Sequence, residues 1–279
     1  MNLAEPCAPF PRPTCGSAFD DSVIQRGFDP ADRWIRGYVD YEWCHARHVF
    51  EQSGVVLKSK RVLEFGCNLG ATAIVLAHLG ALVDAVDIDP AAVEIATLNA
   101  AQYELAHPIR FAHVSDSTAL PFADAYFDAV VCNSVLEYVD AAHLREVQSA
   151  LARVLKPGGL LIVLGTSSRF SPREVHSRRW LVNYLPALFD SMVHSPGPPQ
   201  RGVWPGALRR GFGSDFEDLD WHDHARAYLL ARKAMGAGYW HVTSLAAMAL
   251  LARPFGWSVG MMTPNLSLRL RKKEVEATV

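Results

Sequence analysis

The sequence predicts a doubly wound α/β fold, in which a largely parallel sheet is covered by helices on both faces. Short runs rich in Val, Ile and Leu alternate with helical segments between residues 61 and 164, and a glycine-containing loop directly follows the first run. Because parallel strands need long crossovers, this alternation is typical of strands that lie side by side. A ligand site is expected beyond the carboxyl ends of these strands.

Five strands and three helices are expected in a core spanning residues 55–166. Apolar runs predict the strands, Asp89-Pro90 predicts the start of a helix, and the turn at residues 156–159 predicts the end of another. The expected strands are residues 61–65, 81–86, 109–114, 127–132 and 160–164, and the expected helices are residues 70–79, 89–106 and 141–155.

The segments that flank the core complete a single domain, residues 29–279, behind a flexible N-terminal arm, residues 1–28. Asp29-Pro30 predicts the start of an aromatic-faced helix of about six turns, which Gly54 ends. Residues 167–240 are rich in Arg, Pro, Gly and Trp and are interpreted as a cap-like insert. A closing unit, residues 241–271, is expected to hold a helix at 245–251 and strands at 257–262 and 266–270.

Charge and composition narrow the class of partner. The chain has 279 residues, half of them hydrophobic, and a net charge of −2, so no overall positive field favours nucleic acid. No apolar run reaches the roughly 18 residues that a membrane span needs, so membrane insertion is not expected. The five cysteines lack metal-site spacing and are expected to be reduced, which favours a cytoplasmic protein. A homo-oligomer remains possible.

The loop after the first strand has two candidate ligands. Gly66 and Gly70 permit close approach of a ligand to the backbone. A dinucleotide-binding loop would need a third glycine where Asn68 stands, and the carboxylate of Glu64 would repel phosphates, which disfavours an NAD-dependent oxidoreductase. A cationic ligand suits this loop better.

The segment from Glu64 to Gly70 resembles the first motif of the class I S-adenosylmethionine-dependent methyltransferases, and later segments follow that family's order as far as residue 166. The resemblance implies a Rossmann-like methyltransferase sheet and the cofactor S-adenosyl-L-methionine, which carries an ammonium and a sulfonium but no phosphate. It also implies cofactor contacts at four strand ends, from Glu64, Gly66, Cys67, Asn68, Gly70, Asp87, Ile88, Asp116, Ser117 and Asn133.

Several of these residues have expected roles. Asp87 ends the second strand, where a carboxylate can accept hydrogen bonds from both ribose hydroxyls, and Ile88 follows where it can cover the adenine face. The resemblance makes Asp116 the acceptor for the adenine amino group. Asn68 is among the few side chains that tolerate left-handed backbone.

The expected reaction is methyl transfer to a small molecule, most simply to a hydroxyl of a secondary metabolite, sugar or lipid-like acceptor. N-methylation of an amine is the alternative, and a non-catalytic nucleotide-binding scaffold is the alternative of another class. Asn133 is followed by Ser-Val-Leu, unlike the Pro-Pro-Tyr of enzymes that methylate nucleic-acid bases. Cys132-Asn133 offers no carboxylate for the metal-assisted type, so no metal is expected.

His176 is the candidate general base, because an ordinary pKa near 6.5 suits proton removal at neutral pH. A surface histidine among arginines is the simpler explanation of the same residue. Five aromatic side chains are the candidate acceptor contacts, although a packed helix face is the simpler explanation of them. They are Tyr38, Tyr41, Tyr138, Trp240 and His241.

Overall fold

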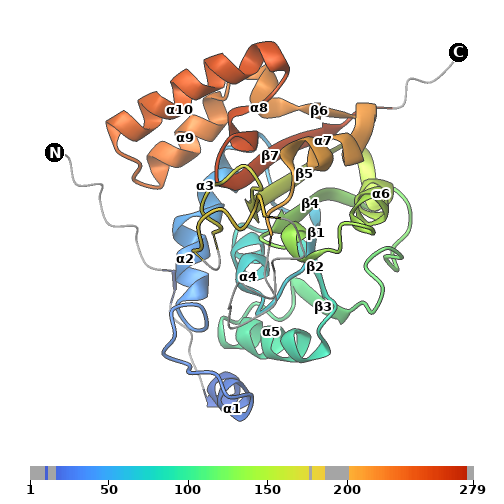
Figure 1. The fold of residues 1–279 in the computed structure, drawn as a ribbon. Coiled ribbons are helices and arrows are strands. Elements are labelled where there is room, and N and C mark those ends of the chain that lie inside the picture. The colour runs from blue at the N-terminus through green and yellow to red at the C-terminus, as the bar shows by residue number, and fades with distance from the viewer. Residues whose placement is uncertain (1–9, 12–16, 176–177, 186–200, 275–279) are drawn as a thin grey trace, which may run out of the picture.

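A computed structural model describes residues 10–11, 17–175, 178–185 and 201–274 (Figure 1). Its centre is a seven-stranded sheet in the order β3-β2-β1-β4-β5-β7-β6. The first five strands along the chain pair in parallel, and β7 pairs antiparallel with β5 and β6. Strand order reverses between β1 and β4, so the predicted doubly wound fold is confirmed. The strands are β1 (Arg61–Phe65), β2 (Leu82–Asp87), β3 (Ile109–His113), β4 (Phe127–Asn133), β5 (Leu155–Ser167), β6 (Phe216–Asp218) and β7 (Asn265–Lys272).

Helices cover both faces of the sheet (Figure 1). Helices α6 and α7 pack on one face, and α3, α4 and α5 pack on the other. The α-helices are α1 (Ser17–Gln25), α2 (Tyr38–Cys44), α3 (Ala46–Glu51), α4 (Ala71–His78), α5 (Pro90–Gln102), α6 (Leu144–Val154), α7 (Pro205–Phe212), α8 (Leu219–His222), α9 (Arg226–Ala234) and α10 (Tyr239–Ala252). Short 3₁₀ turns include η1 (Leu136–Tyr138), η4 (Arg253–Phe255) and η5 (Val259–Met261).

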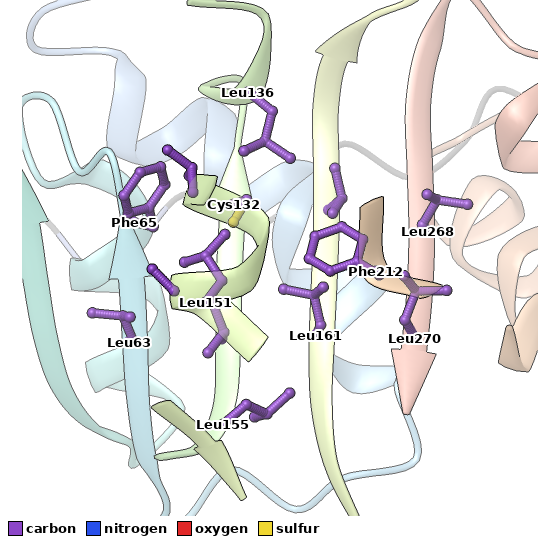
Figure 2. Close-up of a cluster of buried hydrophobic side chains, with 14 of the residues drawn as sticks. Leu63, Phe65, Cys132, Leu136, Leu151, Leu155, Leu161, Phe212, Leu268 and Leu270 are labelled. Atoms are coloured by element: carbon purple, nitrogen blue, oxygen red, sulfur yellow. The ribbon is translucent and has the colours of Figure 1, made fainter. Parts of the chain in front are cut away.

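The side chains of β1 point alternately to the two faces of the sheet and so contribute to two separate hydrophobic clusters. Leu63 and Phe65 lie in the cluster of Figure 2, with side chains of β4, β5, β7, α6 and α7. Val62 points to the opposite face, toward α4. Since side chains alternate along a strand, Glu64 shares the α4 face with Val62, and it is 2% exposed. Each fully buried aliphatic side chain contributes about 1.5–3 kcal/mol of burial free energy, which makes β1 a rigid base for the loop that follows.

The long helix predicted from Asp29 to Gly54 is divided. Residues 30–37 form turns, because the side chains of Asp29 and Asp32 accept hydrogen bonds from backbone N–H groups two residues on and compete with helix formation. Helix α2 begins at Tyr38 and ends before His45, whose backbone angles of −123° and −71° are not helical. The chain therefore turns between α2 and α3.

Two segments outside the predicted core join the packing. Within the predicted N-terminal arm, Ser17–Gln25 form α1 because Phe19 and Val23 make one apolar face, buried with Ile95 of α5. Within the predicted insert, Phe216–Asp218 form β6 and pair with β7. The strand predicted at 257–262 is wrong, since this segment holds the 3₁₀ turn η5. Gly260 in that turn lies against the backbone of β7, and a Cβ there would come within 1.7 Å of the Ser267 carbonyl oxygen.

The cysteines differ from the sequence-based expectation. Cys44 is disulfide-bonded, so the expectation that all five are reduced is wrong. Cys67 and Cys132 are free thiols in the buried core. Burial, reinforced by the charge of Glu64, raises the pKa of both thiols, so neither has the character of an activated nucleophile.

Candidate functional site

A cavity of about 1170 Å³ lies at the carboxyl ends of β1, β2 and β4. This is the edge at which strand order reverses, where a doubly wound sheet binds its ligands. Its walls come from α2, from the loops after four strands and from the start of α6. Ten of the sequence-predicted site residues line it: Tyr38, Tyr41, Gly66, Asn68, Asp87, Ile88, Asp116, Ser117, Asn133 and Tyr138.

The loop after β1 has a backbone that side chains rarely permit. Gly66 and Gly70 have φ values of 76° and 78°, and Asn68 has φ 46°, as expected for a residue that tolerates the left-handed region. A Cβ at Gly66 would lie 2.2 Å from Cγ2 of Val135. The glycine is therefore required by the close approach of the loop after β4, and it leaves bare backbone facing the cavity.

Asp87 fixes this loop from the end of β2. Its Oδ2 accepts a hydrogen bond from the Asn68 backbone N–H at 2.7 Å, and its Oδ1 accepts one from the Asp89 N–H at 3.0 Å. Asp89 in turn caps α5 by accepting from the Ala91 N–H at 2.8 Å. The Asp87 carboxylate is thereby held in one orientation at the cavity wall, beside the exposed side chain of Ile88.

Asp116 adds a second carboxylate at the rim. Its Oδ1 accepts hydrogen bonds from the Thr118 N–H at 2.8 Å and from the Thr118 hydroxyl at 2.6 Å. These bonds hold the pKa of Asp116 below its ordinary value. A charged carboxylate with one oxygen outside this turn suits an amino group of a ligand.

A polar network forms part of the cavity wall and continues into the buried core behind it. Asn133 donates from Nδ2 to the Thr72 hydroxyl at 3.0 Å, and the Thr72 side chain is hydrogen-bonded to Glu64. Asn133 and Tyr38 are also hydrogen-bonded to Glu42, which is 4% exposed and lines the cavity. The network therefore joins α2, α4 and the ends of β1 and β4.

Both carboxyl groups of this network have raised pKa values. Burial raises the pKa of Glu42 to about 7, although the hydrogen bonds from Asn133 and Tyr38 oppose the shift. Burial, followed by the charge of Glu42, raises the pKa of Glu64 well above its ordinary range. The two groups disfavour each other's ionisation and favour a positive charge beside them.

Glu64 also tests whether the expected cofactor fits. Its Oε2 is buried and has no hydrogen-bond partner among the described residues. An unsatisfied buried carboxyl oxygen is costly, and a cation in the adjacent cavity would lower this cost by its charge, without contacting Glu64. The carboxylates of Asp87 and Asp116, beside the bare backbone at Gly66, make the cavity wall more favourable to a cation than to a phosphate. The residues present fit S-adenosylmethionine.

The remaining predicted residues lie elsewhere. Glu64, Cys67 and Gly70 are buried behind the wall and do not line the cavity. Trp240 and His241 do not line it either, because α10 packs through Leu245 and Ala252 and turns these residues to solvent. His176 lies outside the described residues.

Sequence reasoning missed several lining residues. Glu42 is four residues after Tyr38 on α2, and this spacing places it on the same helix face as the aromatic residues. The presence of one charged residue on that face was the signal that could have identified it. Ser134, which follows Asn133, has a left-handed backbone with φ 51°, as Asn68 has in the loop after β1. Strained backbone of this kind is common at functional sites. Further lining residues include Trp34, Val135, His143, Glu146, Gly165, Arg178 and Asn265.

Comparison with known proteins agrees with this geometry. A family model described as a methyltransferase domain matches residues 63–163. A ubiquinone biosynthesis O-methyltransferase from Xanthomonas campestris pv. campestris (strain B100) is 31% identical over 159 residues, which is 56% of this chain and 64% of that protein. The chain thus matches less than two thirds of the length of this relative.

Two solved structures are similar in fold over most of the chain. The [4+2]-cyclase SpnF has a TM-score of 0.53 at 19% identity, covering 96% of this chain and 100% of that one. A putative sarcosine dimethylglycine methyltransferase from Galdieria sulphuraria has a TM-score of 0.51 at 16% identity, covering 84% and 85%. The segment that matches a methyltransferase domain, residues 63–163, contains the loop after β1 and the ends of β2 and β4, which form the cavity.

Proposed function

We propose that this chain transfers a methyl group from S-adenosylmethionine to a hydroxyl of a small molecule, with Glu42 as the general base. The observation that carries the proposal is a nearly fully buried carboxyl group at the cavity wall with a pKa of about 7. A carboxylate of ordinary pKa is a weak base at neutral pH, whereas one near 7 is matched to proton removal. The relative named as an O-methyltransferase supports a hydroxyl acceptor.

Residues at the cavity would hold the cofactor by charge and close approach. Asp87 would accept hydrogen bonds from the ribose hydroxyls and Asp116 one from the adenine amino group. Glu64, behind the wall, would favour the ammonium through its charge and not through contact. The backbone at Gly66 would allow the ligand to approach closely. When bound, the cofactor supplies a methyl group on a positively charged sulfur.

Glu42 would take the proton of the acceptor hydroxyl as the acceptor oxygen bonds to the methyl carbon and the carbon–sulfur bond breaks. Its hydrogen bonds to Tyr38 and Asn133 would hold the carboxylate in one orientation during this step. Tyr38 and Tyr41 lie close to one another, with ring centroids 6.2 Å apart, and offer an apolar wall that would exclude water from the acceptor. Alignment of acceptor and methyl group would supply much of the remaining rate enhancement.

The test begins with calorimetry of S-adenosylmethionine and S-adenosylhomocysteine, for which we expect micromolar dissociation constants. Turnover is then measured with sets of small phenols, sugars and amines, by release of S-adenosylhomocysteine. Release with phenols or sugars supports the proposal. Release with amines alone would assign N-methylation, and binding without any release would favour a non-catalytic scaffold. No binding of either nucleoside would overturn the cofactor assignment.

Replacing Asp87 by Ala should weaken cofactor binding by about 10- to 100-fold, because two ribose hydroxyls lose a charged acceptor and the Asn68 and Asp89 N–H groups lose theirs. Calorimetry measures the change. Asp128→Ala is the matched control: Asp128 accepts from the Arg61 N–H at 2.9 Å and from Lys156 Nζ at 2.8 Å, at the amino ends of the strands. Asp128→Ala should lower the stability of the fold and leave the cofactor affinity unchanged. Equal losses of cofactor affinity in Asp87→Ala and Asp128→Ala would show that Asp87 acts only by stabilising the fold.

A further inference from the structure

Helix α10 presents an apolar surface to solvent. No Asp, Glu, Lys or Arg occurs between Tyr239 and Ala252, and only Leu245 and Ala252 of the helix are buried. Large apolar side chains at both ends are exposed by 70% or more, which is unusual for so many in one short segment. They are Tyr239 (75%), Trp240 (81%), Leu250 (70%), Leu251 (74%) and, just after the helix, Phe255 (78%).

These side chains share one face of α10. Tyr239 and Leu250 are about three helical turns apart and project in nearly the same direction, as do Trp240 and Leu251. The hydroxyls between them are already satisfied: Thr243 donates to the Tyr239 carbonyl oxygen at 2.9 Å, and Ser244 donates to that of His241 at 2.7 Å. This face can therefore leave water with little loss of hydrogen bonding.

The segment that contains α9 and α10 carries charge of a single sign along the sequence. From Ala225 to Pro264 the sequence contains no Asp or Glu, although the whole chain has a net charge of −2. Lys233 lies in the last turn of α9, and Arg253 follows the last residue of α10. The basic residues of this stretch are Arg226, Arg232, Lys233 and Arg253. An anionic surface is the complementary partner.

We propose that the hairpin of α9 and α10 docks the protein on an anionic phospholipid bilayer, with α10 lying along the surface. Its Tyr and Trp side chains would sit at the headgroup level and its leucines at the edge of the acyl chains, between basic residues that contact anionic headgroups. A second copy of the chain is a poorer partner, because a symmetric contact would bring the same cations together.

The position of α10 suits this role. Figure 1 places it on the outer edge of the molecule, and it packs on α9, η4 and η5. Helix α9 in turn contacts α3. At 14 residues, α10 is about 21 Å long, and among the described residues no helix has both the length and the apolarity to cross a membrane. Docking would therefore be peripheral.

Vesicle sedimentation with the full chain tests the proposal. We expect co-sedimentation with vesicles of phosphatidylglycerol and phosphatidylcholine, little with phosphatidylcholine alone, and release at high salt. Trp240→Ser combined with Leu251→Ser should lower the partition coefficient at least about ten-fold, since both side chains leave water on docking. Arg226→Gln combined with Lys233→Gln should lower it about five- to ten-fold and flatten the salt dependence.

Ile24→Ser is the matched control, because Ile24 is 57% exposed on α1, far from α10 in Figure 1. It should leave the partition coefficient unchanged. Circular-dichroism melting confirms that each variant is folded. Absence of sedimentation with anionic vesicles overturns the proposal. An equal loss of the partition coefficient in the two double variants and in Ile24→Ser also overturns it. Light scattering that shows a dimer disrupted by Trp240→Ser, without vesicle binding, would assign the surface to a second copy instead.

Discussion

Replacing Glu42 by Gln should lower kcat by about 100- to 10 000-fold while changing cofactor affinity by less than about ten-fold. The amide retains the size of the side chain but cannot accept the acceptor's proton. In the unmodified protein, kcat/KM should rise with pH through about 7 as Glu42 ionises, and this rise should be absent in the variant. Steady-state kinetics between pH 5.5 and 8.5 measure both effects, with acceptor present at saturation for kcat.

The same substitution should stabilise the fold at alkaline pH. The ordinary carboxyl pKa is 4.5 and that of Glu42 in the fold is about 7, so the folded state holds a proton that the unfolded state releases between these values. Folding stability falls over this pH range, and the loss amounts to about 3 kcal/mol at pH 8 and almost nothing at pH 4. Glu42→Gln removes this cost, so its melting temperature should exceed that of the unmodified protein at pH 8 but not at pH 4.

Glu51→Gln is the matched control for both measurements. Glu51 lies on the neighbouring helix α3, its side chain is 42% exposed, and it pairs with Arg47 and His48 at the surface. Its replacement should leave kcat, its pH profile and the melting temperature at pH 8 nearly unchanged. A Glu42→Gln variant that keeps more than a third of kcat, with the rise through pH 7 intact, would exclude Glu42 as the base.

The parts of the fold that local sequence determines were predicted correctly. Strand β1 has the predicted bounds, residues 61–65, because an apolar run between a basic segment and a glycine is sufficient to define a buried strand. The cavity-lining residues at the ends of β1, β2 and β4 were predicted to lie together for a related reason, since parallel strands bring their carboxyl ends together. In such a fold, much of the cavity wall follows from the order of the strands.

The parts that depend on distant packing were not predicted. Strand β6 has three residues, too few for a pattern, and exists because β7 offers a free edge. Trp240 was expected at the cavity, but an uncharged helix such as α10 carries no polar stripe to show which side faces the protein. The raised pKa of Glu42 depends on tertiary packing, because Glu42 is buried only when α2 packs beside Asn133.

Replacing Gly66 by Ala should weaken S-adenosylmethionine binding at least about 100-fold. The added Cβ would lie 2.2 Å from Cγ2 and 2.7 Å from Cβ of Val135, so the loop after β1 or the loop after β4 must move. Both loops line the cavity, and such a displacement separates the bare backbone of the first loop from the ligand. A left-handed φ of 76° adds strain of about 1–2 kcal/mol for any residue with a Cβ.

Gly54→Ala separates the two effects. Gly54 has nearly the same φ, 80°, but no atom lies within 4 Å of a Cβ built there. This variant should lose about 1 kcal/mol of stability through backbone strain alone and bind the cofactor as tightly as the unmodified protein. Thermal melting of the two variants measures the effect of backbone strain on stability, and calorimetry measures the effect of the contact with Val135 on cofactor binding. If Gly66→Ala binds within about three-fold of the unmodified protein, the loop does not cradle the cofactor, and the carboxylates of Asp87 and Asp116 must account for binding without it.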